Sequence, residues 1–190
     1  MVKKPVLLVV MDGMGLSDSD YGNAVKNAYT PTLDKLMADC PHTSLKASGL
    51  AVGLPSDKDM GNSEVGHNAL GCGQIYSQGA KLVNESIISG EIYQSETWKK
   101  LAANAKDHTM HFIGLLSDGN VHSHISHLKA MIKECKKEGI KRARVHILLD
   151  GRDTPETSAL TYVDDLENEL KELNDDSFDG KIASGGGRMV

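Results

Sequence analysis

One short polar stretch holds the residues best placed for nucleophilic chemistry: MGNSEVGH, residues 60–67. The stretch is too polar for a core strand, and its pattern predicts that a helix starts there, with Asn62 or Ser63 as the N-cap. Backbone N–H groups at a helix N-terminus favour negative charge, so a phosphate or a phosphoserine would be stabilised beside Ser63. The alternative is a capping serine with no catalytic role. The local sequence leaves both interpretations open.

A serine hydroxyl is a poor nucleophile unless a base or a metal activates it. The G-x-S-x-G pattern of serine hydrolases is not matched, because Val65 stands two residues after Ser63 where a glycine would be required. Activation by a metal ion is therefore the more natural chemistry. Asp12, which directly follows an apolar run, is a suitable oxygen ligand for such an ion.

A second polar segment, LLSDGNVHSHISHL at residues 115–128, places several histidines after an apolar run. They could form a metal site or an anion site, although their spacing does not match an ordinary zinc site. For His124 and His127 we favour a role in capping the helix that follows. His122 lies nearest to the end of the predicted strand and is kept as the candidate for ligand binding.

A third segment, LLDGRDTPE at residues 148–156, supplies Asp150, Arg152 and Asp153 in one turn. An arginine presents a fork of donors that suits a carboxylate or a phosphate, and a carboxylate can accept or return a hydroxyl proton. The alternative is an Arg–Asp pair that only makes the turn rigid. Arg188 follows a run of glycines that predicts a loop, which would let the backbone approach a ligand closely or is simply flexible.

The elements that position these residues follow one pattern, an apolar run and then Asp-Gly, at 6–13, 110–119 and 144–151. Uninterrupted apolar runs predict strands that are buried on both faces of a parallel sheet. Amphipathic helices are predicted between them, and Thr30-Pro31 and Thr154-Pro155 each look like an N-cap threonine followed by a proline at the first helical position. The fold class is therefore α/β, with mostly parallel sheets flanked by helices. Ligands of such folds gather at the carboxyl ends of the strands, where the Asp-Gly pairs lie.

Composition changes near residue 76 of the 190-residue chain. The earlier part is rich in glycine and in polar loop residues, whereas the later part alternates cleanly between strand and helix patterns. We therefore predict a domain boundary there, with one domain part at 1–76 and a second at 77–190.

Bulk properties exclude several classes of partner. A net charge of −5 provides no basic face for nucleic acid. No stretch is long enough to span a membrane, and the N-terminal apolar run is too short for a signal peptide. The three cysteines have no CxxC spacing, which is typical of a reducing compartment. We therefore expect a cytoplasmic protein without membrane or nucleic-acid partners.

Taken together, the segments VVMDGMG, GLPSDKDMGNSEVGHNALG, LLSDGNVHSH, LLDGRDTP and IASGGGR resemble the cofactor-independent (2,3-bisphosphoglycerate-independent) phosphoglycerate mutases of the alkaline phosphatase superfamily. The resemblance runs from residue 6 to the end of the chain. It implies that residues 1–76 are the N-terminal half of a phosphatase-like metal domain. Residues 77–190 are then most of a transferase domain that binds the substrate.

The resemblance also implies an isomerase that interconverts 3-phosphoglycerate and 2-phosphoglycerate through a phosphoserine at Ser63. Two divalent metal ions are expected, manganese foremost and magnesium or cobalt otherwise, with no 2,3-bisphosphoglycerate cofactor. Asp12 and Ser63 match ligands of one metal. The matches to substrate-binding residues are His122, Arg152, Asp153 and Arg188. Asp153 also matches the proton shuttle, and the full-length enzyme is expected to be a monomer.

Two departures from the family pattern limit these expectations. Cys72 and Gln74 stand where relatives commonly have alanine and arginine. Family members also continue well beyond 190 residues, through a second set of metal ligands. We therefore expect the 190-residue chain alone to be inactive. Two alternatives are kept: another metal-dependent phosphatase or phosphomutase of the same superfamily, and a non-catalytic fragment that binds phosphorylated acids.

Overall fold

A computed structural model describes residues 4–11 and 13–189. The chain divides into two compact units, Met1–Leu45 and Lys46–Val190, and each is treated by itself. The division falls elsewhere than the domain boundary predicted near residue 76, which concerns the larger enzyme and stays a prediction. In the described residues no helix has both the length and the apolar character needed to cross a membrane.

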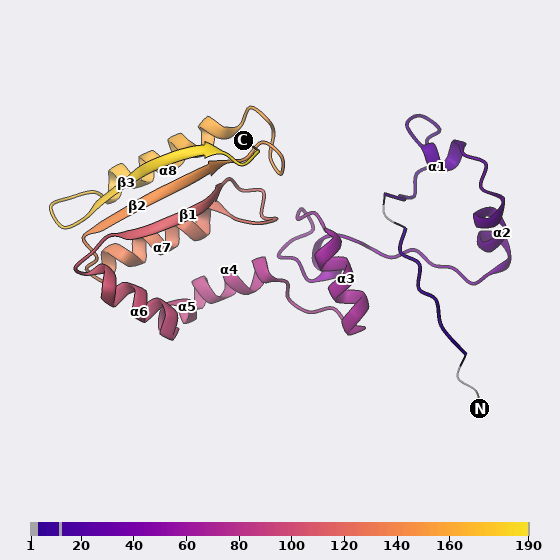
Figure 1. The fold of residues 1–190 in the computed structure, drawn as a ribbon, viewed down its shortest axis with the longest axis horizontal. Coiled ribbons are helices and arrows are strands. Elements are labelled where there is room, and N and C mark those ends of the chain that lie inside the picture. The colour runs from indigo at the N-terminus through magenta and orange to yellow at the C-terminus, as the bar shows by residue number, and fades with distance from the viewer. Residues whose placement is uncertain (1–3, 12, 190) are drawn as a thin grey trace. The chain divides into compact units, whose positions relative to one another are not determined.

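The first unit contains two short helices, α1 (Ala24–Asn27) and α2 (Pro31–Asp39) (Figure 1). Thr30 is the N-cap of α2 and Pro31 is its first residue, as the Thr-Pro pair predicts. The strand expected in the first apolar run is not formed, because residues 6–11 have no regular secondary structure and pair with no strand of the described chain. A parallel strand needs neighbours for its backbone hydrogen bonds, and this unit offers none.

The second unit carries the remaining elements (Figure 1). In chain order these are the 3-10 helix η1 (Gly49–Val52), α3 (Ser63–Cys72), α4 (Gly79–Ser89), α5 (Glu91–Gln94), α6 (Glu96–Ala105), β1 (Met110–Leu116), α7 (Ile125–Lys137), β2 (Arg142–Leu149), α8 (Ala159–Leu173) and β3 (Asp179–Gly187). The strands form a parallel sheet in the order β1-β2-β3. The predicted α/β class is confirmed.

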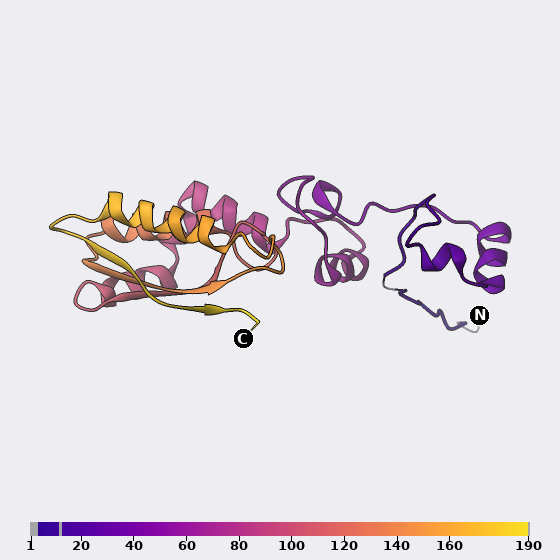
Figure 2. The same cartoon turned by 90° about the horizontal axis from the view of Figure 1, so that it is seen from above.

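The core of this unit lies between the sheet and the helices α7 and α8, which cover one face (Figure 2). Ile132 of α7, Val145 of β2 and Leu166 of α8 are almost completely buried there. The opposite face differs from the prediction of burial on both sides, since Ile113 of β1 is 80% exposed. Strand residues alternate between the two faces, and no helix of the described residues covers this second face.

Helix α8 offers a direct test of this core. Leu166 is 0% exposed, whereas Leu160 of the same helix is 71% exposed. A Leu166→Ala substitution should lower the free energy of unfolding by about 2–5 kcal/mol, because it removes a buried side chain and leaves a cavity. Leu160→Ala, the matched control, should change it by no more than about 0.5 kcal/mol. Urea denaturation, followed by the fluorescence of Trp98 in the same core, measures the free energy of unfolding of both variants. If the two variants lost the same free energy, Leu166 would not be part of the core.

Two local predictions are wrong. Helix α8 does not start at Thr154-Pro155 but at Ala159, after a turn in which Ser158 donates a hydrogen bond to the carbonyl of Pro155. The glycines before Arg188 are not a loop, because they lie in β3 and pair with β2. A side chain at Gly185 would meet Ile147 at 3.0 Å, so glycine is what allows this close pairing.

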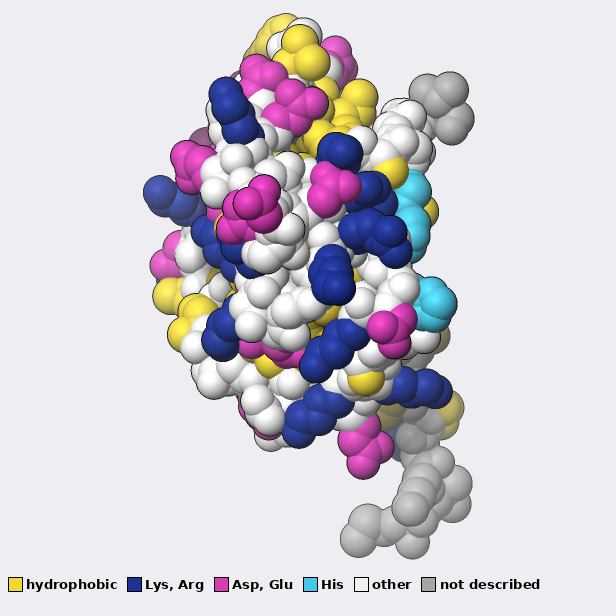
Figure 3. All heavy atoms as spheres, turned by 90° about the vertical axis from the view of Figure 1, so that its left-hand side faces the viewer, with side chains coloured by type: hydrophobic (Ala, Val, Ile, Leu, Met, Phe, Trp, Pro, Cys, Tyr) yellow, Lys and Arg dark blue, Asp and Glu magenta, His cyan; other side chains and the backbone are white. Residues whose placement is uncertain are grey.

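The two ends of the sheet differ in character. At the amino ends of the strands, shown in Figure 3, lysine and arginine side chains are interspersed with aspartate and glutamate. Arg144 of β2, for example, is paired with Asp179 at 2.6 Å. Two of the polar segments singled out in the sequence, residues 115–128 and 148–156, begin at the opposite, carboxyl ends of β1 and β2.

Candidate active site

The carboxyl ends of β1 and β2 bring two of the Asp-Gly segments together. Ser117, which directly follows β1, donates a hydrogen bond of 2.7 Å to Asp150, which directly follows β2. Gly119 lies so close to the second loop that a Cβ atom on it would be 2.9 Å from Cβ of Asp153. Neighbouring parallel strands end at the same edge of a sheet, and here that geometry places the two loops in direct contact.

Asp150 is the buried centre of this contact, with a side chain that is only 2% exposed. Its Oδ1 accepts hydrogen bonds from the backbone N–H groups of Gly151, Arg152 and Asp153. Burial alone would raise the pKa of Asp150, but the hydrogen bonds from Ser117, from the Asp153 and Arg152 backbone and from Arg188 hold that pKa well below its usual range. Asp150 is therefore a carboxylate in the folded protein.

This lowered pKa has a consequence for stability. Because the pKa of Asp150 is lower in the folded than in the unfolded chain, its ionisation stabilises the fold above the unfolded value of about 3.9, and the contribution is lost as the pH falls below it. The difference in free energy of unfolding between the wild type and an Asp150→Asn variant should therefore shrink between pH 6 and pH 3. Urea denaturation across that range measures it, and a constant difference would contradict the assignment.

Arg188, which follows β3, joins Asp150 to Asp153. Its Nη1 lies 3.0 Å from Oδ1 of Asp150 and 2.7 Å from Oδ2 of Asp153, and these pairings raise its pKa, the one with Asp153 foremost. His122 approaches from the other loop, with Nε2 3.9 Å from the same Asp153 oxygen. The structure thus brings together three of the predicted substrate-binding residues. The side chain of the fourth, Arg152, is exposed, and only its backbone joins the network.

Helix α3, which carries the predicted nucleophile Ser63, is capped by the residue before that serine. Asn62 is the N-cap of α3, and its side chain accepts a hydrogen bond of 3.0 Å from the N–H of Val65. Ser63 is the first residue of the helix and is exposed. A capping role for Ser63 is therefore excluded, and its hydroxyl lies at the helix N-terminus, where backbone N–H groups favour an anion.

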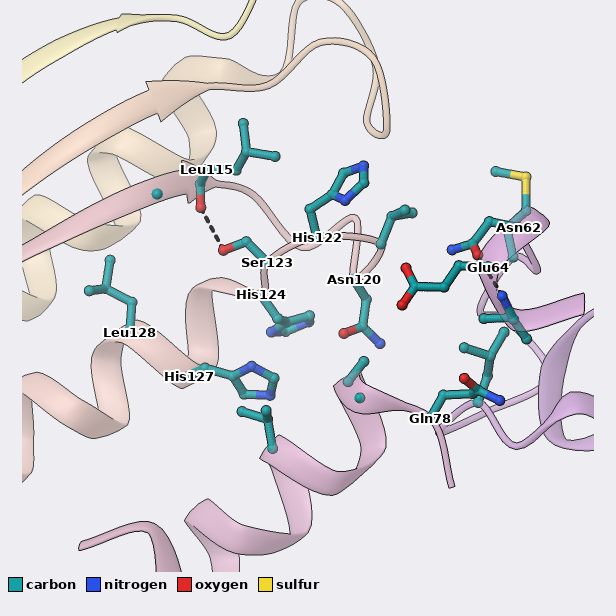
Figure 4. A pocket seen from close by; sticks show the side chains of 18 of the residues that line it. Asn62, Glu64, Gln78, Leu115, Asn120, His122, Ser123, His124, His127 and Leu128 are labelled. Atoms are coloured by element: carbon teal, nitrogen blue, oxygen red, sulfur yellow. Dashed lines mark hydrogen bonds between the residues drawn. The ribbon is translucent and has the colours of Figure 1, made fainter. Parts of the chain in front are cut away.

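A cavity of about 520 Å³ lies between the N-terminal turn of α3 and the loop that follows β1 (Figure 4). Glu64, the residue after Ser63, lines the cavity and extends from α3 toward the loop that carries Asn120 and His122 (Figure 4). Among the described residues, no hydrogen bond or ion pair joins the Ser63 side chain to Asp153 or Arg188. The cavity is lined by Asn62 and Glu64 on one side and by His122 on the other, but not by Ser63, Asp153 or Arg188, so the predicted nucleophile and the substrate-binding residues are not preassembled.

One contact across this region was not predicted from the sequence. Asn120 has a left-handed backbone, with φ of 56°, and its side chain donates a hydrogen bond of 2.5 Å to Asp59. Asp59 also accepts from the backbone N–H and the hydroxyl of Ser56. Asn after Asp-Gly is a turn signal that tolerates this backbone, but its partner, 61 positions earlier, leaves no mark in the sequence.

Two histidines of the loop serve α7. His124 is the N-cap, and its Nδ1 accepts from the N–H of Ser126 at 3.2 Å, so the predicted capping role is confirmed for it. His127 lies in the first turn of α7, where burial and the neighbouring His124 lower its pKa. It lines the cavity and does not cap the helix.

The predicted metal site is not assembled by the part of the chain that the structure describes. Asp12 lies outside the described residues. Elsewhere in residues 4–11 and 13–189, no group of three or more His, Cys, Asp and Glu side chains is arranged to hold a metal ion. Ser63 and its neighbours therefore do not form a metal centre by themselves.

Comparison with known proteins gives a consistent result. The family described as BPG-independent PGAM N-terminus matches residues 83–190. A probable 2,3-bisphosphoglycerate-independent phosphoglycerate mutase of Leptospira interrogans is 50% identical over 98% of this chain and 35% of its own length. The 2,3-bisphosphoglycerate-independent phosphoglycerate mutase 1 of Arabidopsis thaliana is 48% identical over 98% of this chain and 34% of its own length.

A solved structure also matches. A Leishmania mexicana phosphoglycerate mutase, crystallised at low cobalt concentration, is 49% identical and superimposes with a TM-score of 0.85 over 95% of this chain and 33% of its own. The chain thus spans about a third of the length of the relatives that it matches.

Proposed function

The chain belongs to the family of 2,3-bisphosphoglycerate-independent phosphoglycerate mutases, and from that premise we propose that its residues interconvert 3-phosphoglycerate and 2-phosphoglycerate within a longer enzyme. The observation that carries the proposal is the convergence of His122, Asp153 and Arg188 at the carboxyl ends of the strands. An arginine fork, a histidine and a carboxylate at one point suit a phosphorylated hydroxy acid.

Two half-reactions describe the proposed chemistry. Ser63 first loses its hydroxyl proton to water. Its Oγ then attacks phosphorus, the bond from phosphorus to the glycerate oxygen O3 breaks, and O3 takes the proton that Asp153 carries at the start. The glycerate then turns, and Asp153 removes the proton from O2 as that oxygen attacks the phosphoserine and releases Ser63. The exposed position of Ser63 at the start of α3 supports this role, because the helix N-terminus stabilises the anionic phosphoserine.

The remaining polar residues would hold the substrate. Arg188 and the exposed Arg152 are the proposed anion binders, and His122 is proposed to orient the substrate above Asp153. Closure of the two domains of the longer enzyme over trapped glycerate would exclude water and so prevent hydrolysis of the phosphoserine. We propose that these domains meet near residue 76.

Family membership and the cobalt-containing relative support a requirement for divalent metal. We propose two ions, manganese foremost, with Asp12 and Ser63 among the ligands and with no 2,3-bisphosphoglycerate cofactor. Such ions would lower the pKa of a hydroxyl and neutralise phosphate charge. Because the described residues do not form a metal centre alone, we propose that residues 1–190 do not turn over substrate by themselves. All three cysteines are free, two of them exposed, which supports a cytoplasmic enzyme, proposed to be monomeric.

An assay of the full-length enzyme tests the proposal. With manganese and without 2,3-bisphosphoglycerate, it should convert 3-phosphoglycerate to 2-phosphoglycerate, whereas residues 1–190 should not. Hydrolysis of a generic phosphate ester without mutase activity would instead identify a phosphatase of the same superfamily. Calorimetric binding of 3-phosphoglycerate with no turnover by the full-length protein would identify a non-catalytic binder.

Gly119 provides a test of the loop packing around Asp153. A Gly119→Ala substitution in the full-length enzyme should lower kcat/KM by about 10- to 100-fold, because the new methyl group would meet Cβ of Asp153 at 2.9 Å and displace it. Gly114→Ala, in β1, is the matched control, since a Cβ there meets nothing within 4 Å. Equal activity of the two variants would show that the position of Asp153 does not matter to catalysis.

A further inference from the structure

The carboxylate of Asp150 has no role in the chemistry just described, yet it is the most connected side chain of the site. Its Oδ1 accepts three backbone N–H groups of its own turn and Nη1 of Arg188, and its Oδ2 accepts the hydroxyl of Ser117. Ser117 is itself buried, with an exposed fraction of 1%. A carboxylate that is only 2% exposed is covered by these partners and cannot reach a substrate in the cavity.

We propose that Asp150 is a positioning residue that sets the orientation of Arg188 and of Asp153 for phosphoglycerate. The inference rests on the proposed function and extends it. Asp150 acts on Asp153 through the backbone, by fixing the turn in which Asp153 sits. It acts on Arg188 through a direct charge-assisted hydrogen bond.

The geometry at Arg188 shows what this positioning achieves. Both carboxylates contact the same nitrogen, Nη1, at 3.0 Å for Asp150 and 2.7 Å for Asp153. No hydrogen bond within the described residues uses Nη2 or Nε of Arg188. Because the guanidinium is planar, fixing Nη1 at one corner aims the two remaining donor nitrogens in a fixed direction, where they can bind an anion.

Asp150 also determines the charge around Asp153. The groups that face the Asp153 carboxylate are the Arg188 guanidinium, the imidazole of His122 at 3.9 Å and, through the shared Arg188, the Asp150 carboxylate. Replacing Asp150 by asparagine would remove one repelling charge and leave Arg188 paired with Asp153 alone, so the arginine would be drawn toward Asp153.

Asp175 offers a matched control. Its carboxylate also accepts two backbone N–H groups of its own turn, from Ser177 and Phe178, together with the Ser177 hydroxyl and the Lys136 ammonium group. It follows α8 and precedes β3, at the amino ends of the strands, away from the site. Asp175→Asn thus disturbs the same kind of turn without touching Arg188 or Asp153.

The experiment compares the full-length wild type with the Asp150→Asn and Asp175→Asn variants, in kcat and KM for 3-phosphoglycerate and in calorimetric binding of the same substrate. For Asp150→Asn we expect kcat/KM to fall about 10- to 100-fold, with a higher KM and weaker binding. Asp175→Asn should match the wild type in both measurements. An unchanged KM and unchanged binding in Asp150→Asn would overturn the inference and leave Asp150 a purely structural residue.

The outcomes also separate this inference from the proposed function. If the wild type binds 3-phosphoglycerate but does not isomerise it, the proposed function fails. The loss of binding in Asp150→Asn relative to Asp175→Asn still measures the positioning of Arg188.

A second variant serves if Asp150→Asn folds poorly. Ser117→Ala removes one hydrogen-bond partner of Asp150 and keeps the charge of Asp150. Weaker binding by that variant would support the inference, whereas binding equal to that of the wild type would contradict it.

Discussion

A Ser63→Ala variant of the full-length enzyme should lose at least about four orders of magnitude of mutase activity while its stability stays unchanged. Loss of a nucleophile typically removes most of kcat, and no other side chain of α3 presents a hydroxyl at the helix N-terminus. Stability should persist because Ser63 is exposed and the cap of α3 is its neighbour, Asn62. Mutase assays and urea denaturation of the same preparation measure both quantities.

Asn62→Ala is the control for stability in this experiment. Removing an N-cap side chain should lower the free energy of unfolding by about 1 kcal/mol, since the N–H of Val65 loses its acceptor.

A labelling experiment tests the phosphoserine directly. Wild-type enzyme is incubated with labelled 3-phosphoglycerate and quenched with acid, and mass analysis of the peptide that contains Ser63 should then find the phosphoserine. Retained activity in Ser63→Ala, or label on another residue, would contradict the assignment.

Arg188→Ala should have the second-largest effect. It removes the proposed anion binder, and hydrogen bonds to charged groups contribute about 1.5–3 kcal/mol each, so kcat/KM should fall at least about 100-fold. It also leaves two largely buried carboxylates, Asp150 and Asp153, without their cation. The free energy of unfolding should therefore fall by about 3 kcal/mol at neutral pH, and by less as the pH is lowered.

Two control variants separate the expected loss of activity from the expected loss of stability. Arg188→Lys keeps the positive charge but not the planar fork, so it should recover more of the stability than of the activity. Arg144→Ala, which breaks the partly exposed pair with Asp179 at the other end of the sheet, should cost no more than about 1 kcal/mol and leave activity unchanged. Equal activity of Arg188→Lys and the wild type would argue against recognition of the substrate by the arginine fork.

The sequence predicts strands β1 and β2 well, but it does not predict β3. β1 and β2 were found because their apolar runs are long and end in Asp-Gly, and the contact between their loops follows from parallel pairing. β3 was missed because its glycines show no apolar pattern. Among them, Gly185 is explained by its close approach to Ile147, which depends on a neighbouring strand.

The candidate site likewise contains residues that the sequence identifies and one whose importance it does not reveal. His122, Asp153 and Arg188 were identified by residue type and resemblance, and the structure brings them together. Asp150 was seen as part of the same turn but was given no role. Its importance comes from burial and from bonds to Ser117 and Arg188, both more than thirty positions away in the chain. Long-range partners of this kind leave no periodic pattern in a sequence.

The exposed run Val6–Met11 has a practical consequence. These six residues are 95% to 50% exposed, uncharged and without regular secondary structure, and several are β-branched. Such a segment is a template on which other copies can add as strands, and in the sequence the nearest charged residues are Lys3 and Lys4 before it and Asp12 after it. Recombinant residues 1–190 should therefore collect in inclusion bodies, whereas a truncation that begins at Lys46 should remain in the supernatant and be the better starting point for crystals.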